Sequence, residues 1–196
     1  MLRTPINMTE LEQYIKSYFE VIEQGDLQTI SSLFRLTTIR KGEYFLKTGK
    51  TCDKLCFIQS GLLRIFIPKD GKEVTQWIST PGSLVADLSS LVFESPARFT
   101  IQALGDCVRY IINGEDYKKI GNLVPKWHEL ETLFMVKCFI ILEDRIFSHL
   151  SMTAEERYDL FFANNRELFN QVPLQYIASM LGMTPETFSR IRKKRL

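Results

Sequence analysis

Apolar residues recur at different spacings in successive parts of this chain. In residues 8–34 they follow a helical period, at Leu11, Ile15, Tyr18, Phe19 and Ile22, and Gly25 is a stop signal. The pattern predicts an N-terminal helical segment.

From about Leu36 the pattern changes to short runs rich in β-branched and aromatic residues. The runs are Tyr44–Leu46, Lys54–Gln59, Leu62–Ile67, Val74–Ile78, Thr100–Leu104 and Cys107–Ile112. Turn signals separate them at intervals of about 8–12 residues, which is typical of small all-β domains. Asp70-Gly71 favours a primed hairpin turn, because its twist matches that of the flanking strands. This segment is predicted to form a small β-sandwich or barrel.

A long helix is predicted from Pro125 to about Leu150, after a short helix capped by Asn113. Its apolar positions at steps of three and four are the candidate dimer-interface residues Leu133, Val136, Ile140 and Phe147. Phe134 and Phe139 make further faces apolar, so the helix needs two partners. We expect these to be its own β-domain and the same helix of a second subunit. The alternative is a helix buried wholly inside one large core.

A capping box, Thr153-Ala-Glu-Glu156, predicts a further helix through about Asn164. The domain boundary is expected near His149–Thr153. The predicted organisation is residues 1–124 for the N-terminal helices and β-domain, 125–150 for the long helix and 151–196 for a C-terminal domain.

Residues 172–196 predict two short helices around a tight turn. Pro173 suits the first N-terminus, and Ile177 and Leu181 share one face beside the small Ala178. Gly182 supplies the positive φ that a sharp turn needs.

The second helix is capped by Thr184 and begins at Pro185, with Phe188 and Ile191 facing inward and Met183 filling the gap between the helices. Together the two helices predict a helix-turn-helix. The alternative is a plain helical hairpin packed into a larger core.

The outward face of this second helix carries groups that can contact base edges: Glu186, Ser189, Arg190 and Lys193. Residues 172–196 hold five Lys/Arg residues and one Glu, so their net charge of +4 exceeds the +2 of the whole chain. Such asymmetry favours a tail that binds phosphate.

The composition, 45% hydrophobic and 24% charged residues over 196 positions, is that of a soluble globular protein. The start, Met1 to Glu12, has no signal-peptide pattern, and the longest apolar stretch, Cys138 to Leu142, is too short to span a membrane. We therefore expect a cytoplasmic protein.

The four cysteines of the chain lack paired spacing and are expected to be free thiols. For Cys52 and Cys56, burial as small hydrophobic residues is favoured over a role as a thiol sensor.

The order of β-domain, long helix and helix-turn-helix resembles the Crp/Fnr family of bacterial transcription regulators. The most specific segments are Phe57-Ile-Gln-Ser-Gly61, Asp70-Gly-Lys-Glu73, Pro81-Gly82, Ile177-Ala-Ser-Met-Leu-Gly182 and Thr184-Pro-Glu-Thr-Phe-Ser-Arg190. The resemblance implies an α+β fold: a cyclic-nucleotide-binding-like β-barrel of the double-stranded β-helix (jelly-roll) type, a long dimerisation helix and a C-terminal winged-helix-like helix-turn-helix. Since this sequence stops at Leu196, we expect the wing to be truncated.

By the same resemblance, the base-contacting positions are Pro185, Glu186 and Arg190. A proline offers no charged or amide group, so specificity should differ from that of the cyclic-AMP receptor. Arg190 is the candidate for guanine and Glu186 for a cytosine amino group. The full DNA-binding set is Gln175, Thr184, Pro185, Glu186, Thr187, Ser189, Arg190, Arg192, Lys193, Lys194 and Arg195, the last four mainly for phosphate.

The effector pocket departs from that of cyclic-nucleotide binders in the family, which use a Gly-Glu-Leu turn and an arginine. Here the turn is Ala86-Asp87-Leu88, Ala97 stands where the arginine belongs, and Arg98 lies one place along, on the opposite strand face. We therefore expect no cyclic nucleotide, and either another small effector or none. The candidate pocket residues are Gly82, Asp87, Leu88, Ser89, Arg98, Phe99 and Thr100; the alternative is that they are turn and surface residues of a dismantled pocket.

Enzyme classes find no support in the sequence. A metal-dependent cupin needs histidines inside the barrel, whereas His128 and His149 both lie on the predicted long helix. No cysteine precedes Cys52, which excludes the N-terminal iron–sulfur cluster of some family members. Neither a Gly-x-Ser-x-Gly elbow nor a phosphate loop occurs. We expect no catalytic site, no metal and no resident cofactor.

The function predicted from the sequence is that of a homodimeric regulator that binds a near-palindromic operator in double-stranded DNA. The resemblance implies RNA polymerase as a further partner, and no membrane association. The alternative is a ligand-sensing or protein-interaction module of the same fold whose helix-turn-helix no longer binds DNA.

Overall fold

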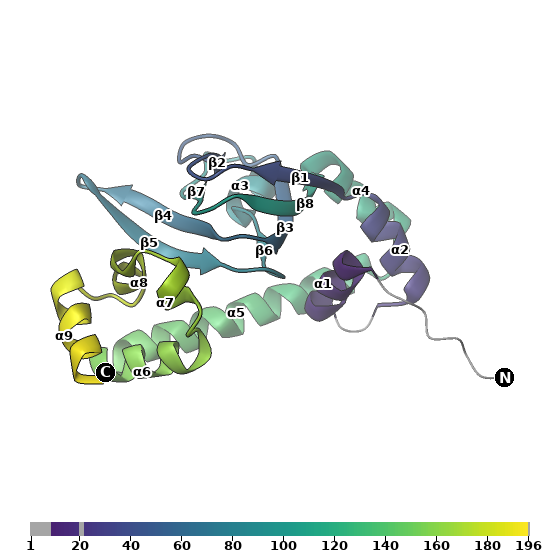
Figure 1. The fold of residues 1–196 in the computed structure, drawn as a ribbon. Helices are drawn as coiled ribbons and strands as arrows, with labels where there is room; N and C mark the ends of the chain where they lie inside the picture. Colours follow the sequence, from purple (N-terminus) through teal and green to yellow (C-terminus); the bar gives the residue numbers. More distant parts are fainter. Residues whose placement is uncertain (1–8, 20–21, 196) are drawn as a thin grey trace.

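The computed structural model describes residues 9–19 and 22–195, in which helices flank a block of strands (Figure 1). The N-terminal helices are α1 (Glu10–Phe19) and α2 (Gln24–Ser32). The strands are β1 (Arg35–Ile39), β2 (Tyr44–Leu46), β3 (Lys54–Ser60), β4 (Leu63–Lys69), β5 (Lys72–Ser79), β6 (Leu84–Val85), β7 (Thr100–Ala103) and β8 (Cys107–Asn113), with α3 (Leu88–Phe93) between β6 and β7. The C-terminal helices are α4 (Gly114–Leu123), α5 (Trp127–Ser151), α6 (Ala154–Asn164), α7 (Leu168–Gln171), α8 (Leu174–Met180) and α9 (Pro185–Arg195).

The β-domain is a sandwich of two antiparallel sheets. Their strand orders are β1-β8-β3-β6 and β2-β7-β4-β5. Apolar residues of both sheets, among them Ile58, Leu63 and Ile101, fill the space between them. The outer face of the first sheet packs through Phe57 against α1, α4 and the start of α5. The predicted sandwich-or-barrel segment is thus a two-sheet sandwich, with α1, α4 and the start of α5 on the outer face of the first sheet.

Local signals in the sequence placed several elements correctly. Lys69 and Lys72 pair across the hairpin, and Asp70 and Gly71 both have positive φ, 52° and 73°, as a primed turn requires. Asn113 accepts the Asp116 amide at the start of α4. The predicted capping box is present at the start of α6.

The predicted helical character of residues 8–34 is confirmed for the part that the structure describes, but the prediction that Gly25 stops a helix was wrong. Two helices lie in this segment, and Gly25 is the second residue of α2, which ends at Ser32 with Leu33 as its C-cap. Glycine is tolerated there because a first-turn residue has no helical acceptor for its amide. Met8, like all of residues 1–8, and residues 20–21 lie outside the described residues.

Short elements were missed by the sequence analysis. Strand β6 has only two residues, and α3 and α7 have six and four, too few for a hydrophobic period to show. Strand β1 was also missed as a separate run, since most of its residues are not buried and its Leu36 is exposed.

The long helix α5 has 25 residues, of which only Trp127, Leu130 and Phe134 are buried in this chain. The predicted interface residues are exposed: Leu133 52%, Val136 50%, Ile140 49% and Phe147 66%. The alternative of a helix buried in one core is therefore wrong. The α5 face, as we call these four residues, is apolar and uncovered.

Gly61, between β3 and β4, provides a test of the packing. Its φ is +88°, and a Cβ there would lie 2.5 Å from Cys107 Sγ and 2.6 Å from the Asp106 carbonyl oxygen. Gly61→Ala should therefore lower the free energy of unfolding by at least about 2 kcal/mol more than Gly71→Ala. Gly71 is the matched control, because it has positive φ but open space around it. Urea unfolding followed by circular dichroism measures both; equal losses would contradict the predicted clash.

Candidate nucleic-acid interface

Helices α8 and α9 occupy the positions that the sequence predicted. Pro173 is the N-cap of α8, and Gly182 has a φ of +69° in the turn. Thr184 Oγ1 accepts the Thr187 amide at 3.2 Å, and Pro185 is the first residue of α9. The predicted helix, turn and helix are thus present; we call them the C-terminal helix pair.

A compact core lies beneath the C-terminal helix pair. Ile177 and Ala178 are fully buried, and Phe188 and Ile191 are each 1% exposed. The ring of Tyr158 on α6 meets the ring of Phe188 edge-on at 5.2 Å between centroids. The inward positions predicted from the sequence are therefore the buried ones.

The outer face of α9 carries four exposed polar residues. Glu186, Ser189, Arg190 and Lys193 all point away from the core, as predicted. The pKa of Glu186 is lowered because its carboxylate accepts the amide at the start of α9, so this group is ionised at neutral pH. The face therefore combines two cations and one anion.

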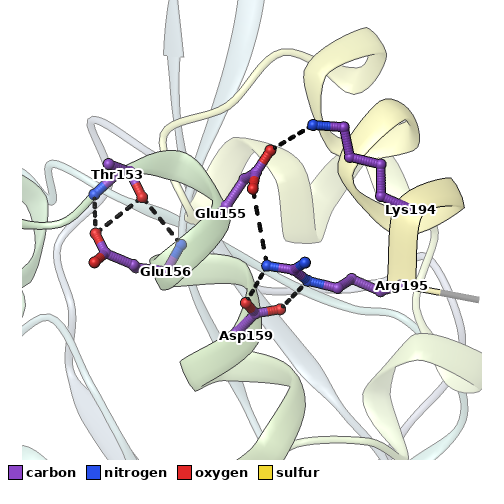
Figure 2. A network of polar contacts seen from close by, with 6 residues as sticks. All are labelled: Thr153, Glu155, Glu156, Asp159, Lys194 and Arg195. Carbon is purple, nitrogen blue, oxygen red and sulfur yellow. Dashed lines mark hydrogen bonds and ion pairs between the residues drawn. The ribbon is translucent and has the colours of Figure 1, made fainter.

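The end of α9 is fixed to α6 by ion pairs (Figure 2). Lys194 Nζ lies 2.9 Å from Glu155 Oε1, and Arg195 donates to Asp159 Oδ1 and Oδ2 at 2.8 and 2.6 Å. These contacts lower the pKa of Glu155 and of Asp159, since each holds the ionised carboxylate. Two of the predicted phosphate ligands thus have partners in their own chain.

The C-terminal helix pair also rests on the β-domain (Figure 1). Strand β5 is at a sheet edge, and its Thr75 amide donates to Ser179 Oγ on α8 at 2.9 Å. Arg64 of β4, 1% exposed, has its Cζ 3.6 Å from the centroid of the Tyr176 ring on α8 and forms an ion pair with Glu73. This contact was not found from the sequence, because nothing local marks a buried arginine.

A β-bulge in β5 provides a second contact between the β-domain and the C-terminal helices. Ile65 and Phe66 are consecutive on β4 but pair with Trp77 and Thr75, which leaves Gln76 as the extra residue. Arg145 of α5 donates to the Gln76 carbonyl and, at 3.1 Å, to the carbonyl of Met180 on α8. One side chain therefore joins the β-domain, α5 and α8.

Gln175 and Pro185 differ in position from the other predicted DNA contacts. Both line a groove of about 520 Å³ between the C-terminal helix pair and the β4–β5 hairpin, opposite Lys72, Glu73 and Val74. They therefore lie at the hairpin side of the interface rather than on the outer face of α9. Of the remaining predicted residues, Thr184 is exposed, and Thr187 and Arg192 are half-buried.

In the predicted effector region, Asp87 lies in the turn between β6 and α3, and its carboxylate accepts hydrogen bonds from the backbone of that region. The residue is 3% exposed, and its oxygens accept the Ser90 amide at 3.1 Å and the Arg98 amide at 2.9 Å. Ser90 Oγ accepts the Cys52 amide at 2.8 Å and donates to the Ser95 carbonyl. These backbone donors are therefore already paired within the chain.

Among the other candidate effector residues, the Arg98 backbone contacts Asp87, but the side chains of Arg98 and Thr100 contact other groups. The Arg98 side chain is exposed, with its Cζ 5.1 Å over the Phe99 ring, while Ala97 is buried in the sandwich core. Thr100 Oγ1 accepts the Thr48 amide at 3.1 Å. Gly82, Leu88 and Ser89 are half-buried. This arrangement favours the alternative of a dismantled pocket.

Cys52, Cys56 and Cys107 lie in the sandwich core as free thiols. Burial raises the pKa of Cys56 to about 12 and also raises the pKa values of the other two. Protonated, enclosed thiols fit the interpretation as small hydrophobic residues.

Part of the chain matches a known family model. Residues 36–122 match the family model of the cyclic nucleotide-binding domain. No curated protein sequence matches the chain significantly. None of the described helices is long and apolar enough to cross a membrane.

Solved structures share the fold at low identity. FixK2 from Bradyrhizobium japonicum matches with a TM-score of 0.69 and 19% identity, over 82% of this chain and 83% of that one. The catabolite activator protein of Thermus thermophilus matches with a TM-score of 0.57 and 21% identity, over 90% and 85%. The regulatory domain of Toxoplasma gondii PKA, crystallised with cAMP, matches with a TM-score of 0.52 and 20% identity over 57% of this chain. This chain spans 43% of that regulatory domain, less than half its length.

The hydrogen bond between the Thr75 amide and Ser179 Oγ can be tested by mutation. Ser179→Ala removes the acceptor and leaves the Thr75 amide unpaired at the strand edge. Because a hydrogen bond contributes roughly 0.5–1.5 kcal/mol, we expect this amide to exchange with solvent up to about tenfold faster. Hydrogen exchange followed by NMR measures it, with Ser189→Ala on the outer face of α9 as the control. An unchanged exchange rate in Ser179→Ala would show that α8 is not held through this contact.

Proposed function

We propose that this protein is a homodimeric regulator that binds specific DNA sequences through α9, with the C-terminal helix pair acting as a helix-turn-helix. The fold shared with the catabolite activator protein and the cyclic nucleotide-binding domain match support a regulatory protein rather than an enzyme. DNA binding itself is inferred from the chemistry of α9.

The observation that carries the proposal is the two-sided character of α9. Phe188 and Ile191 are buried, whereas Arg190 and Lys193 are exposed and have no hydrogen-bond or ion-pair partner among the described residues. Figure 1 shows α9 at the opposite end of the molecule from α1 and α2. A helix so placed, polar outside and free of neighbours on that side, has the dimensions that a DNA major groove admits.

The side chains of α9 divide into two roles under this proposal. Arg190 offers a planar fork of donors that matches guanine, and the ionised Glu186 accepts from a cytosine amino group. Lys193 contacts phosphate, which adds affinity without sequence preference. Lys194 and Arg195 contribute less to phosphate binding, since binding DNA would compete with their ion pairs to Glu155 and Asp159.

The α5 face is the proposed dimer contact. Leu133, Val136, Ile140 and Phe147 recur at steps of three and four and are about half-exposed or more. A second strip, Met135, Phe139, Leu142, Ile146 and Leu150, widens the exposed apolar surface. Apolar patches of this extent mark interaction sites. Two copies paired through α5 would present two α9 helices to half-sites about one DNA turn apart, so the operator is expected to be nearly palindromic.

The proposal includes no cyclic nucleotide. Asp87 already binds the amides of Ser90 and Arg98, and a cyclic phosphate beside its carboxylate would meet like charge. Any signal for this regulator therefore comes from another small effector or from changes in protein concentration.

A second candidate function is that of an interaction module of the same fold that does not bind DNA. The observation in its favour is that Gln175 and Pro185 face the β4–β5 hairpin while Lys194 and Arg195 are ion-paired. Salt dependence separates the candidates, because phosphate neutralisation makes affinity fall steeply with salt. Absent binding, or a flat salt response, would favour this second function.

Arg190→Ala tests the role of α9. Affinity for the preferred operator should fall by about 1–3 kcal/mol with relaxed base preference, because a bidentate contact is lost. Lys193→Ala should instead weaken specific and random DNA alike and reduce the salt slope by about one. Fluorescence anisotropy at two salt concentrations measures both, and Lys118→Ala, an exposed lysine on α4, is the control. Unchanged affinity and preference in Arg190→Ala would refute the assignment.

Ile140→Glu tests the α5 face. A carboxylate at this position would be buried without a partner in a paired helix, so the variant should sediment as a monomer where the wild type sediments as a dimer. The control is Leu123→Glu, an equally exposed leucine (50%) on α4. Analytical ultracentrifugation gives the masses. A monomeric wild type, or a dimer that tolerates Ile140→Glu, would exclude this interface.

A further inference from the structure

A cavity of about 250 Å³ lies where β5, the end of α5, α6 and the end of α8 meet. Its walls are largely apolar, with Trp77 from β5, Leu160 and Phe161 from α6 and Met180 from α8. The cavity opens to solvent, since Trp77 is 39% and Leu160 49% exposed, and its volume exceeds the roughly 150 Å³ that holds a benzene molecule in an enclosed cavity. The space is therefore large enough for a ring with a short side chain.

Two guanidinium groups, those of Arg145 and Arg157, belong to the lining of this cavity. Their partners are backbone carbonyls: Gln76 and Met180 for Arg145, and Leu181 and Met152 for Arg157. Each guanidinium keeps further N–H donors beyond these bonds. Neither has a carboxylate partner among the described residues, and the lining contains no Asp or Glu.

Some other arginines among the described residues, unlike Arg145 and Arg157, have carboxylate partners. Arg64 is buried but paired with Glu73, and Arg195 is paired with Asp159. Burial lowers the pKa of Arg145, since the charged form has lost water there. Arg145 is thus a partly desolvated cation without a carboxylate partner among the described residues, beside an apolar space. An anion bound there would form charge-assisted hydrogen bonds with the guanidinium group.

We propose that this cavity binds a small organic monocarboxylate, whose apolar body packs against Trp77, Leu160 and Phe161 and whose carboxylate pairs with Arg145 and Arg157. The Arg145 guanidinium carbon lies 5.2 Å from the Trp77 ring centroid, so charge and apolar wall are adjacent. The side-chain amides of Asn164 and Asn165 lie in the same lining; each donates one N–H to a backbone carbonyl, of Leu160 and Phe161 respectively, and keeps a second N–H.

The location of the cavity gives such a ligand a structural consequence. Trp77 belongs to the β-domain, whereas Leu160 and Met180 belong to the C-terminal helices, so a bound molecule contacts both. A ligand that prefers one relative placement of these parts increases its population. The binding site itself does not depend on whether α9 binds DNA, so the two proposals can fail separately.

The test is a titration of the full chain, without DNA, with 3-phenylpropionate and with the neutral 3-phenylpropionamide. We expect the acid to bind and the amide to bind at least tenfold more weakly, because only the acid pairs with the guanidinium groups. Isothermal calorimetry gives the affinities. Trp77 fluorescence should change on binding, and Trp77→Phe should remove this change, since the other tryptophan, Trp127, is buried in a separate core.

Leu160→Trp locates the site by filling the cavity while leaving both arginines in place. This variant should lose calorimetric binding of the acid, whereas Leu36→Trp, at an exposed leucine on β1, should retain it. Equal affinity for acid and amide would overturn the proposed charge pairing. No saturable binding at millimolar acid, or binding retained in Leu160→Trp, would overturn the site.

Discussion

The free edge of β5 is the constraint on which the arrangement of the β-domain and C-terminal helices depends. This strand pairs with β4 on one side only, and an uncovered edge would leave backbone donors and acceptors open to other chains. Ser179 accepts the Thr75 amide and Arg145 donates to the Gln76 carbonyl, so α8 and α5 complete the edge. Helix α9 follows α8 through the turn at Gly182, so the contact at Ser179 holds the segment that leads into α9. The contacts that cover the β5 edge therefore also hold the helix that precedes the proposed DNA-binding helix.

Several basic side chains near the C-terminal helix pair make contacts within the chain, although those of Lys194 and Arg195 stay partly exposed. Arg64 supports Tyr176, Arg157 donates to the end of α8, and Arg195 binds Asp159. Arg190 and Lys193 remain on the outer face of α9. The local net charge alone would have overstated the surface available to phosphate, because ion pairs within the chain neutralise part of it.

The β-domain matches the model of the cyclic nucleotide-binding domain, and hydrogen bonds within the chain hold its Asp87 turn. Residues 36–122 match that family, yet Asp87 fills the turn with hydrogen bonds to Ser90 and Arg98. Meanwhile an apolar cavity with two arginines lies at the junction of the β-domain and the C-terminal helices. The fold and the ligand preference of such a domain can therefore change independently. Packing of the two sheets maintains the sandwich, whereas a few side chains determine which ligand binds.

The sequence by itself determined the features that depend on neighbours along the chain. The Asp70-Gly71 turn, the caps at Asn113 and Thr153, and the buried and exposed sides of α9 follow from local backbone preference and helical period. Only the tertiary structure decided which strand edge α8 covers, which cations are paired and where the cavity lies. The reason is distance along the chain: Thr75 and Ser179 are 104 residues apart, and Arg195 and Asp159 are 36 apart. No local pattern encodes such partners, because they meet only when the sandwich and the helices have packed.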